Sequence, residues 1–332
     1  MKLPASAATG LRDGAAVVHA PVAVIELAGA GAVSALQGLL TNDVEKPGDG
    51  SFLYGALLTP KGMVVVEGWA GRSGQRVTYT VPGAARERTL EILKRFIPPR
   101  LARLTDRTDE LGVLRVIGPR ALTLAQAAGV PLPSAPGRLA SGTAFGVSFE
   151  VAQPVDAGPP PFALQITGTK EALAAVEQRL ASVGARATDP AALEFARILV
   201  GWPSIEAEVD DKTLPQEIRF DEVAGVSYTK GCYTGQETVS RLHFRGHTNR
   251  SLRGLLFDAE PADASPAVLY QDREAGAVTS VAWLPQGSGG SGRWIGLALL
   301  RREVTPGAVV RAGGADARVV DLPFAPNYVV PA

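Results

Sequence analysis

Thiols and imidazoles are scarce in this chain of 332 residues, which contains one cysteine, Cys232, and three histidines. A single thiol excludes an intramolecular disulfide. It also disfavours an iron–sulfur cluster held by this chain alone, because such a cluster usually takes four thiolates; the chain could at most share one with a partner. The opening residues, MKLPASAATG, lack the charged and then apolar segments of a secretory signal. These features predict a reducing, cytoplasmic setting.

An excess of charge of either sign is also absent, since 33 Lys and Arg residues balance 33 Asp and Glu residues. We therefore expect no direct nucleic-acid partner and no acidic disorder, and any electrostatic recognition must be local. Long apolar runs are lacking too. The uncharged stretch 275–292 contains too many Gly, Ser and Pro residues to cross a bilayer, so no membrane association is expected.

Apolar residues make up 46% of the chain, which is enough for a sizeable core and, at this length, for two or three domains. Strand and helix patterns alternate up to about residue 250, with apolar strands such as VAVIEL and QRVTYTV and amphipathic helices such as KEALAAVEQRLASVG. This mixture, with antiparallel hairpins, predicts an α+β fold. Asp189 and Pro190 are typical of a helix start, with the aspartate as N-cap.

Beyond Arg253 the pattern changes to six short strands separated by Pro, Gly and Asp, without helical periodicity. The spacing predicts a small closed or sandwiched β domain, with GSGGSG, residues 287–292, as a flexible loop within it. We therefore expect two parts, residues 1–250 and 251–332, the first of them composed of two subdomains.

A glycine pair, Gly29-x-Gly31, follows the strand pattern at residues 22–27 and precedes a helix pattern. A dinucleotide-binding fingerprint would need a third glycine, where Ser34 stands instead. The pair is therefore better interpreted as a tight turn between strand and helix.

The stretch YTKGCYTGQETVSRLHFRGH, residues 228–247, holds the only cysteine and two of the three histidines. A zinc site could use Cys232, His243 and His247, but Gly246 interrupts the helix between them and no second cysteine completes the ligand set. Alternatively, Cys232 is a reactive or ligand-contacting thiol, favoured as thiolate by nearby cations, or a small buried hydrophobe. The polar residues around it argue against burial.

Positive charge gathers around this stretch and could hold an anion. The basic residues of the window 230–253 stand against Glu237 alone; they are Lys230, Arg241, Arg245, Arg250 and Arg253.

The motif KGCYTGQE, residues 230–237, followed by RLHFRG, resembles the signature of the YgfZ folate-binding family, a relative of the glycine-cleavage T-protein that includes mitochondrial iron–sulfur assembly factors. Further segments extend the resemblance over nearly the whole chain: LQGLLTNDV at 36–44, LLTPKGMVV at 57–65, AVTSVAW at 277–283 and VVDLPF at 319–324.

This resemblance implies two interleaved α+β subdomains around a central folate-sized cavity, with a C-terminal β-barrel. It implies a tetrahydrofolate-linked accessory protein that supports maturation or repair of iron–sulfur enzymes, among them a tRNA methylthiolation enzyme, so the implied partners are a folate and iron–sulfur enzymes or assembly proteins. The implied folate-binding residues are Arg197, Tyr233, Gln236, Arg241 and Arg245. The implied motif residues are Lys230, Gly231, Cys232, Tyr233, Gly235, Gln236 and Glu237, with Cys232 facing the cavity as the candidate functional thiol.

Two departures from the family pattern bear on activity. The paired aspartates of T-proteins correspond to Val65 and Val66, which cannot move a proton, so glycine-cleavage chemistry is disfavoured and no catalytic residue is assured. In the family's R-I-E-x-G helix, Leu199 stands in place of the glutamate that pairs with the pterin edge. Glu194 or Glu206 could replace it as acceptor.

Two rival hypotheses stay open. A folate-dependent transferase or demethylase would need a base near the cavity, for which Glu67 and Asp43 are candidates. An interaction scaffold that has lost the folate would fit the replacement at Leu199.

Overall fold

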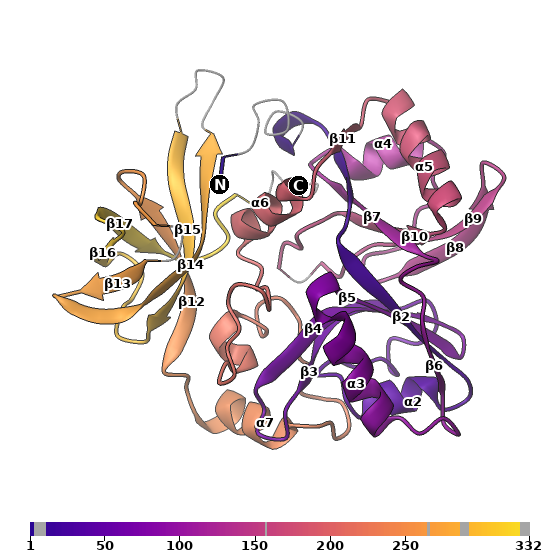
Figure 1. The fold of residues 1–332 in the computed structure, drawn as a ribbon, viewed down its shortest axis with the longest axis horizontal. Helices are drawn as coiled ribbons and strands as arrows, with labels where there is room; N and C mark the ends of the chain where they lie inside the picture. Colours follow the sequence, from indigo (N-terminus) through magenta and orange to yellow (C-terminus); the bar gives the residue numbers. More distant parts are fainter. Residues whose placement is uncertain (3–10, 157, 264–265, 286–291, 326–332) are drawn as a thin grey trace.

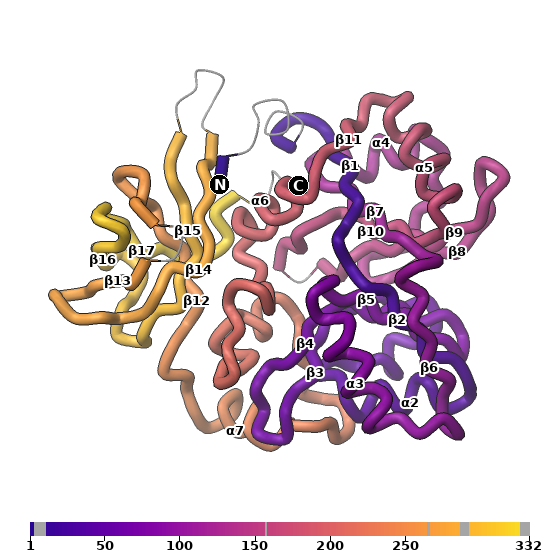
Figure 2. The backbone as a smooth tube through the Cα atoms, viewed as in Figure 1, coloured from indigo at the N-terminus to yellow at the C-terminus, as the bar shows by residue number. Residues whose placement is uncertain are grey.

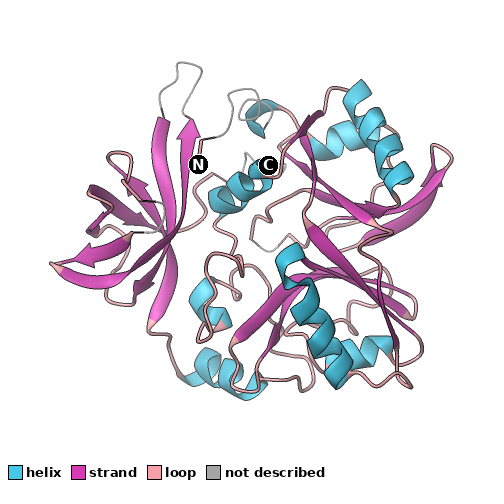
Figure 3. Ribbon diagram, viewed as in Figure 1, coloured by secondary structure: helices cyan, strands magenta, loops and turns pink. Residues whose placement is uncertain are grey.

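The computed structural model describes residues 1–2, 11–156, 158–263, 266–285 and 292–325. Two sheets flanked by helices lie side by side, and a β-barrel packs beside them (Figures 1 and 3). The predicted α+β class and C-terminal barrel are confirmed. Within the described residues, no helix is long and apolar enough to span a membrane.

The first sheet has the strand order β3-β4-β5-β2-β6 and is antiparallel throughout. Its elements are β2 (Val22–Ala28), α2 (Ala32–Gln37), β3 (Phe52–Leu58), β4 (Val64–Ser73), β5 (Arg76–Pro82), the short 3-10 helix η1 (Gly83–Ala85), α3 (Arg86–Phe96) and β6 (Arg103–Asp106). The turn between β2 and α2 has the tight geometry expected for the glycine pair. Gly29 has φ +123°, and a Cβ on Gly31 would lie 2.6 Å from the Leu101 carbonyl oxygen.

The second sheet has the order β11-β1-β7-β10-β9-β8. Its elements are β1 (Ala16–His19), β7 (Gly112–Ile117), α4 (Ala121–Ala127), β8 (Leu139–Ala144), β9 (Val147–Ala152), β10 (Leu164–Gly168), α5 (Lys170–Ser182) and β11 (Arg186–Thr188). Because β1 belongs to this sheet and β2 to the first, the chain passes between the subdomains at once, as Figure 2 shows. The subdomains are therefore interleaved in sequence.

Three elements connect the sheets to the barrel: α6 (Ala191–Val200), the 3-10 helix η2 (Pro215–Ile218) and α7 (Gln236–Arg245). Helix α6 begins directly after the Asp189-Pro190 pair, but Pro190 rather than Asp189 is its N-cap residue; Asp189 Oδ1 accepts a hydrogen bond from the Ala191 N–H at 2.8 Å. Gly201 ends this helix in the left-handed conformation, with φ +64°. The helix lies between the barrel and the two sheets (Figure 1).

The barrel is closed in the order β12-β15-β14-β13-β16-β17. All six predicted strands are present: β12 (Arg250–Phe257), β13 (Ala267–Tyr270), β14 (Arg273–Pro285), β15 (Gly292–Arg301), β16 (Val309–Ala312) and β17 (Ala315–Val320). The predicted GSGGSG loop lies outside the described residues except for Gly292, the first residue of β15. Apolar residues alternate inward along the strands and fill the barrel core.

A single buried cluster joins the three parts. It combines aromatic residues of the first sheet with apolar residues of α6, of the signature motif at residues 230–237 and of the barrel wall. Within it, Tyr54, Trp69 and Trp202 pack against one another at centroid distances of 4.9 to 5.5 Å, and the two tryptophan rings are stacked. Two residues of this cluster, Trp69 and Trp202, also line the candidate site.

Candidate functional site

A cavity of about 420 Å³ lies where the two sheets meet α6. It is lined by strands β4 and β5 of the first sheet, by β7 of the second, by α6 and by the segment that follows α6. Its aromatic lining is Trp69 and Trp202, and its ionisable lining is Glu67, Arg115, Glu194, Arg197 and Glu206. The volume falls within the range typical of small-molecule sites.

Glu67 is a buried carboxylate on β4, with 8% of its surface exposed. Burial raises its pKa to about 7, even though the positive charges of Arg115 and Arg197 oppose the shift. The pairing of β3 with β4 sets Ala56 opposite Glu67, which makes Tyr54 its diagonal neighbour on the same face. The Tyr54 hydroxyl is fully buried beside Glu67, where it favours the charged form of the carboxylate. Glu67 lines the cavity, whereas the Tyr54 side chain lies behind it and is not part of the lining.

Arg115, on β7, lines the same cavity as Glu67. Its guanidinium lies 4.3 Å from the centroid of the Phe162 ring and donates to Gln165 Oε1 at 3.2 and 3.3 Å. Burial lowers the pKa of Arg115 to about 10, so it stays protonated at neutral pH. The sequence analysis missed this residue, although a lone arginine within the apolar strand VLRVIG was a detectable signal.

Arg197 lies in the cavity wall, but its five N–H donors are already used. They reach Glu194 (two bonds), Glu208, Ser280 Oγ and the Trp202 carbonyl oxygen. Burial opposes its protonation, but Glu208 and Glu194 hold the pKa of Arg197 above its ordinary value. Since Ser280 belongs to β14, this arginine fastens the barrel to α6, and no donor is left over for the implied folate contact.

Leu199 is fully buried and does not line the cavity. Its carbonyl oxygen accepts the Phe324 N–H at 2.8 Å. Glu194 and Glu206, the two acceptors considered in its place, both line the cavity. Acidic groups are therefore present at its wall despite the leucine.

The valines at the positions of the paired aspartates do not line the cavity, but Glu67, one of the two candidate bases, does. Val66 packs into the core on the far side of β4, and Val65 lies at an irregularity in the β3–β4 pairing. The next residue, Glu67, reaches the cavity instead. The other candidate base, Asp43, does not line it. Burial opposes ionisation of Asp43, but hydrogen bonds from the Lys46 N–H and the Gln37 amide lower its pKa.

The signature motif lies outside the cavity and fastens two chain segments together. Lys230 is buried, and its Nζ donates to the carbonyl oxygens of Gln37, Leu40 and Asn42 at 2.7, 2.6 and 2.8 Å. Burial lowers its pKa to about 8. The suggestion that Lys230 contributes to an anion site is therefore wrong, because its ammonium group caps the LQGLLTND segment.

The remaining motif residues pack the start of α7 against the turn between β3 and β4. Gly235 has φ +84°, and a Cβ there would lie 2.6 Å from the Thr59 carbonyl oxygen. Gln236 Oε1 accepts the Tyr233 N–H at 3.3 Å, and the Tyr233 ring is buried in the central cluster. Gly231 and Glu237 are exposed. Neither Tyr233 nor Gln236, both implied folate contacts, lines the cavity.

Cys232 is exposed, so its interpretation as a buried hydrophobe is wrong. The expectation that Cys232 faces the cavity is also wrong, because Cys232 is not among the lining residues. Arg241 and Arg245 are also exposed, on α7 at the edge of the molecule away from α6 (Figure 1). Two further arginines of the expected patch have acidic partners: Arg250 pairs with Glu217 and Asp210, and Arg253 pairs with Asp321. Nearness in sequence did not bring these cations to the cavity, because α7 carries Arg241 and Arg245 outward while Arg250 and Arg253, on β12, pair with carboxylates.

The described residues contain no group of three or more His, Cys, Asp or Glu side chains placed to hold a metal ion. His243 stacks on Tyr228 and lies 3.3 Å from Asp221. The imidazole that a zinc site would use is thus engaged with an aromatic ring and a carboxylate.

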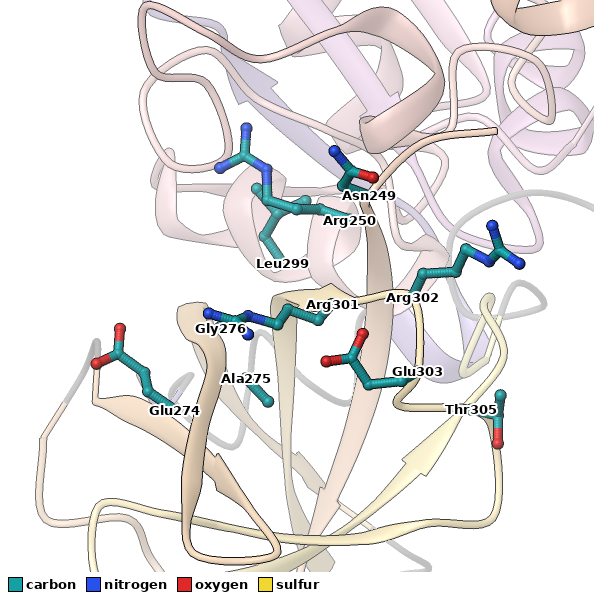
Figure 4. Close-up of a pocket in the computed structure, with 10 residues that line it drawn as sticks. All are labelled: Asn249, Arg250, Glu274, Ala275, Gly276, Leu299, Arg301, Arg302, Glu303 and Thr305. Carbon is teal, nitrogen blue, oxygen red and sulfur yellow. The ribbon is translucent and has the colours of Figure 1, made fainter. Parts of the chain in front are cut away.

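A second hollow, of about 850 Å³, lies at one end of the barrel (Figure 4). Figure 4 shows Arg301 and Arg302 extending in opposite directions, with Glu303 between them. These side chains are exposed and do not converge on a common point. The smaller cavity at Glu67, which combines buried ionisable groups with aromatic walls, is therefore the candidate site.

Comparison with known proteins agrees with this architecture. The GCVT N-terminal domain model matches residues 10–132. The tRNA-modifying protein YgfZ of Colwellia psychrerythraea is 30% identical over 240 residues, covering 69% of this chain and 70% of that protein. An aminomethyltransferase of Rubrobacter xylanophilus is 29% identical over 305 residues, covering 89% of this chain and 79% of that protein.

Among solved structures, the glycine cleavage system aminomethyltransferase T from Bartonella henselae superposes with a TM-score of 0.80 at 17% identity. The match covers 97% of this chain and 89% of the aminomethyltransferase, so the two share the whole fold, barrel included. Together with the identity to the Colwellia protein over more than two thirds of its length, this shows that the chain belongs to the YgfZ family of proteins with the GcvT-like fold.

Proposed function

We propose that the cavity binds tetrahydrofolate or a derivative of it, and that the chain is an accessory protein in the maturation or repair of iron–sulfur enzymes, including a tRNA methylthiolation enzyme. Membership of the YgfZ family, whose relatives are described as tRNA-modifying, supports the second part. The chemistry of the cavity supports the first part.

The observation that carries the folate proposal is that the buried carboxylate of Glu67 and the guanidinium of Arg115 line one cavity beside two tryptophans. A pterin is a flat ring system with N–H donors on one edge and a carbonyl oxygen beside them. Glu67 would accept the N–H bonds, and Arg115 would donate to the carbonyl oxygen. The residues present therefore fit the proposed ligand.

The exposed face of the signature motif suits contact with a protein partner. Lys230 and Gly235 hold the loop in place, while Cys232 stays accessible. In our proposal, Cys232 contacts the iron–sulfur enzyme or assembly protein that the chain serves, and folate occupies a separate site.

The pKa of Glu67, about 7, favours one alternative function, a folate-dependent methyl or aminomethyl transferase. A carboxylate that titrates near neutrality can take a proton from a bound amine and return it. Turnover of a methylamine-type donor with tetrahydrofolate, lost in Glu67→Gln, would support this alternative.

Calorimetric titration of tetrahydrofolate into the full chain, under anaerobic and reducing conditions, tests the folate proposal. We expect saturable heat, competition by a folate analogue, and binding weakened by Glu67→Gln. Glu303→Gln, the same substitution at an exposed acid of the barrel, should bind as the wild type does. Absence of heat and of competition would refute folate binding.

The cellular role is tested by rescue of cells that lack their own family member, with tRNA methylthiolation measured by mass spectrometry. We expect rescue by the wild type and by Glu303→Gln, and weaker rescue by Cys232→Ser and Glu67→Gln. Full rescue by a variant that does not bind folate would instead support the interaction scaffold.

A further inference from the structure

The outer face of α7 presents an exposed aromatic ring between two free cations. Phe244 is 67% exposed, more than the other large hydrophobic residues exposed in the described part of the chain. Arg241 and Arg245 lie three residues before it and one after it, which places all three on the solvent side of the helix, opposite the buried Val239. Neither guanidinium has an ion-pair partner among the described residues.

This ring belongs to a fixed aromatic cluster. His243 lies flat on Tyr228, with centroids 3.6 Å apart and an interplanar angle of 17°, and Phe244 meets His243 edge-on at 4.8 Å. Asp221 accepts the Tyr228 hydroxyl at 2.5 Å and lies 3.3 Å from His243 Nδ1. The rings are held in place before any ligand arrives, so little side-chain entropy would be lost on stacking against them.

A third cation lies beside this face. The β3–β4 turn packs against the start of α7, since a Cβ on Gly62 would lie 2.9 Å from Thr238 Cβ. Lys61, at the tip of the same turn, is exposed and has no ion-pair partner among the residues described. The acids nearby are Asp221, which is already engaged, and the exposed Glu222 and Glu237.

We propose that this face binds a short segment of single-stranded RNA, with one base stacked on Phe244 and the adjacent phosphates held by Arg241, Arg245 and Lys61. Unpaired bases stack on aromatic rings and guanidinium planes, whereas a duplex hides its bases and needs a longer basic surface. A protein-docking face would be expected to bury a larger apolar patch than one phenylalanine with flanking arginines. The expectation of no nucleic-acid partner rested on the balanced total charge of the chain. A local group of cations can bind phosphates even when the total charge is balanced.

Fluorescence anisotropy with a labelled 12-nucleotide single-stranded RNA of mixed sequence, titrated with the full chain, tests the proposal. We expect micromolar binding in low salt. Phe244→Ala should weaken it by at least about fivefold, and Phe244→Trp should preserve it, because any flat ring can stack. Arg241→Ala with Arg245→Ala should weaken binding and reduce the slope of log affinity against log salt by about 1.4, or roughly 0.7 for each lost phosphate contact.

Arg302→Ala, which removes an exposed arginine of the barrel, is the matched control and should leave binding unchanged. RNA binding that is absent, or that ignores both the Phe244→Ala and the double arginine substitutions, would overturn the proposal. An acidic peptide that binds with Phe244 dependence when RNA does not would assign the face to a protein and equally overturn it. Titration of the same variants with tetrahydrofolate shows separately whether the cavity still binds its proposed ligand.

Discussion

Replacing Glu67 by glutamine should stabilise the protein while weakening its proposed ligand binding. The pKa of this carboxyl is raised from 4.5 to about 7, mainly by burial. Between those values the unfolded chain has released its proton and the folded chain has kept it, so stability falls as pH rises through this window. Below about pH 4.5 both states hold the proton, so burial of Glu67 no longer lowers the free energy of unfolding through this linkage.

The size of the effect follows from the shift. A rise of about 2.5 units corresponds to about 3 kcal/mol once pH exceeds 7, at 1.36 kcal/mol per unit. Glutamine has nearly the same shape and no charge to desolvate, so Glu67→Gln should be more stable than the wild type by about 3 kcal/mol at pH 8.5. At pH 5.5 the same linkage leaves an advantage of about 1 kcal/mol.

Urea unfolding followed by circular dichroism at pH 5.5, 7 and 8.5 measures this difference, with Glu303→Gln as the exposed control. Ligand affinity should move in the opposite direction, because an amide cannot replace the charged acceptor; we expect tetrahydrofolate binding to weaken by about 10- to 100-fold. A stability difference independent of pH, or a variant less stable than the wild type at pH 8.5, would refute the reasoning on burial of this carboxylate.

Three further substitutions test the signature region. Lys230→Met leaves three carbonyl oxygens without their donor. It should lower the free energy of unfolding, measured in urea titrations, by roughly 3 kcal/mol or more. A loss below about 1 kcal/mol would mean that water replaces the ammonium group. Gly235→Ala forces a Cβ towards the Thr59 carbonyl oxygen at positive φ. A Cβ added at Gly231 would meet no neighbouring atom within 4 Å, so the melting temperature of Gly235→Ala should fall clearly below that of Gly231→Ala. Equal melting temperatures would contradict the geometry. Cys232→Ala should change stability by less than about 0.5 kcal/mol, and iodoacetamide should label native wild-type Cys232 as fast as the denatured chain, whereas protection in the native state would contradict its exposure.

The local pattern of the sequence was enough to predict most elements. In α5, Leu173, Val176 and Leu180 recur at helical spacing and are buried, together with Ala172. The six barrel strands follow apolar runs bounded by turn residues in the same way. The parallel pairing of β1 with β11 was not predictable, because those residues are far apart in the chain and periodicity carries no information on non-local partners.

The candidate site was harder to predict than the fold. Cations at positions 230 to 253 suggested an anion site, but sequence does not tell whether a cation meets a ligand, a carboxylate or a backbone carbonyl. Lys230 meets carbonyls, Arg250 meets carboxylates, and Arg241 meets solvent. The better signal was a lone ionisable residue inside an apolar strand. Glu67 and Arg115 are two such residues, and both lie at the cavity floor.

The conspicuous signature and the cavity therefore have different physical roles. Lys230 and Gly235 are restricted by packing: one must reach three carbonyl oxygens, and the other must bring backbone within contact of the β3–β4 turn. Such residues identify the fold because no other side chain meets the same geometric demands, and they do so without touching a ligand. The central aromatic cluster, which contains Trp69 at the cavity and Tyr233 in the signature loop, joins the two regions in one rigid core. A ligand at Glu67 and a partner at the exposed signature surface would thus bind two separate regions that pack against the same cluster.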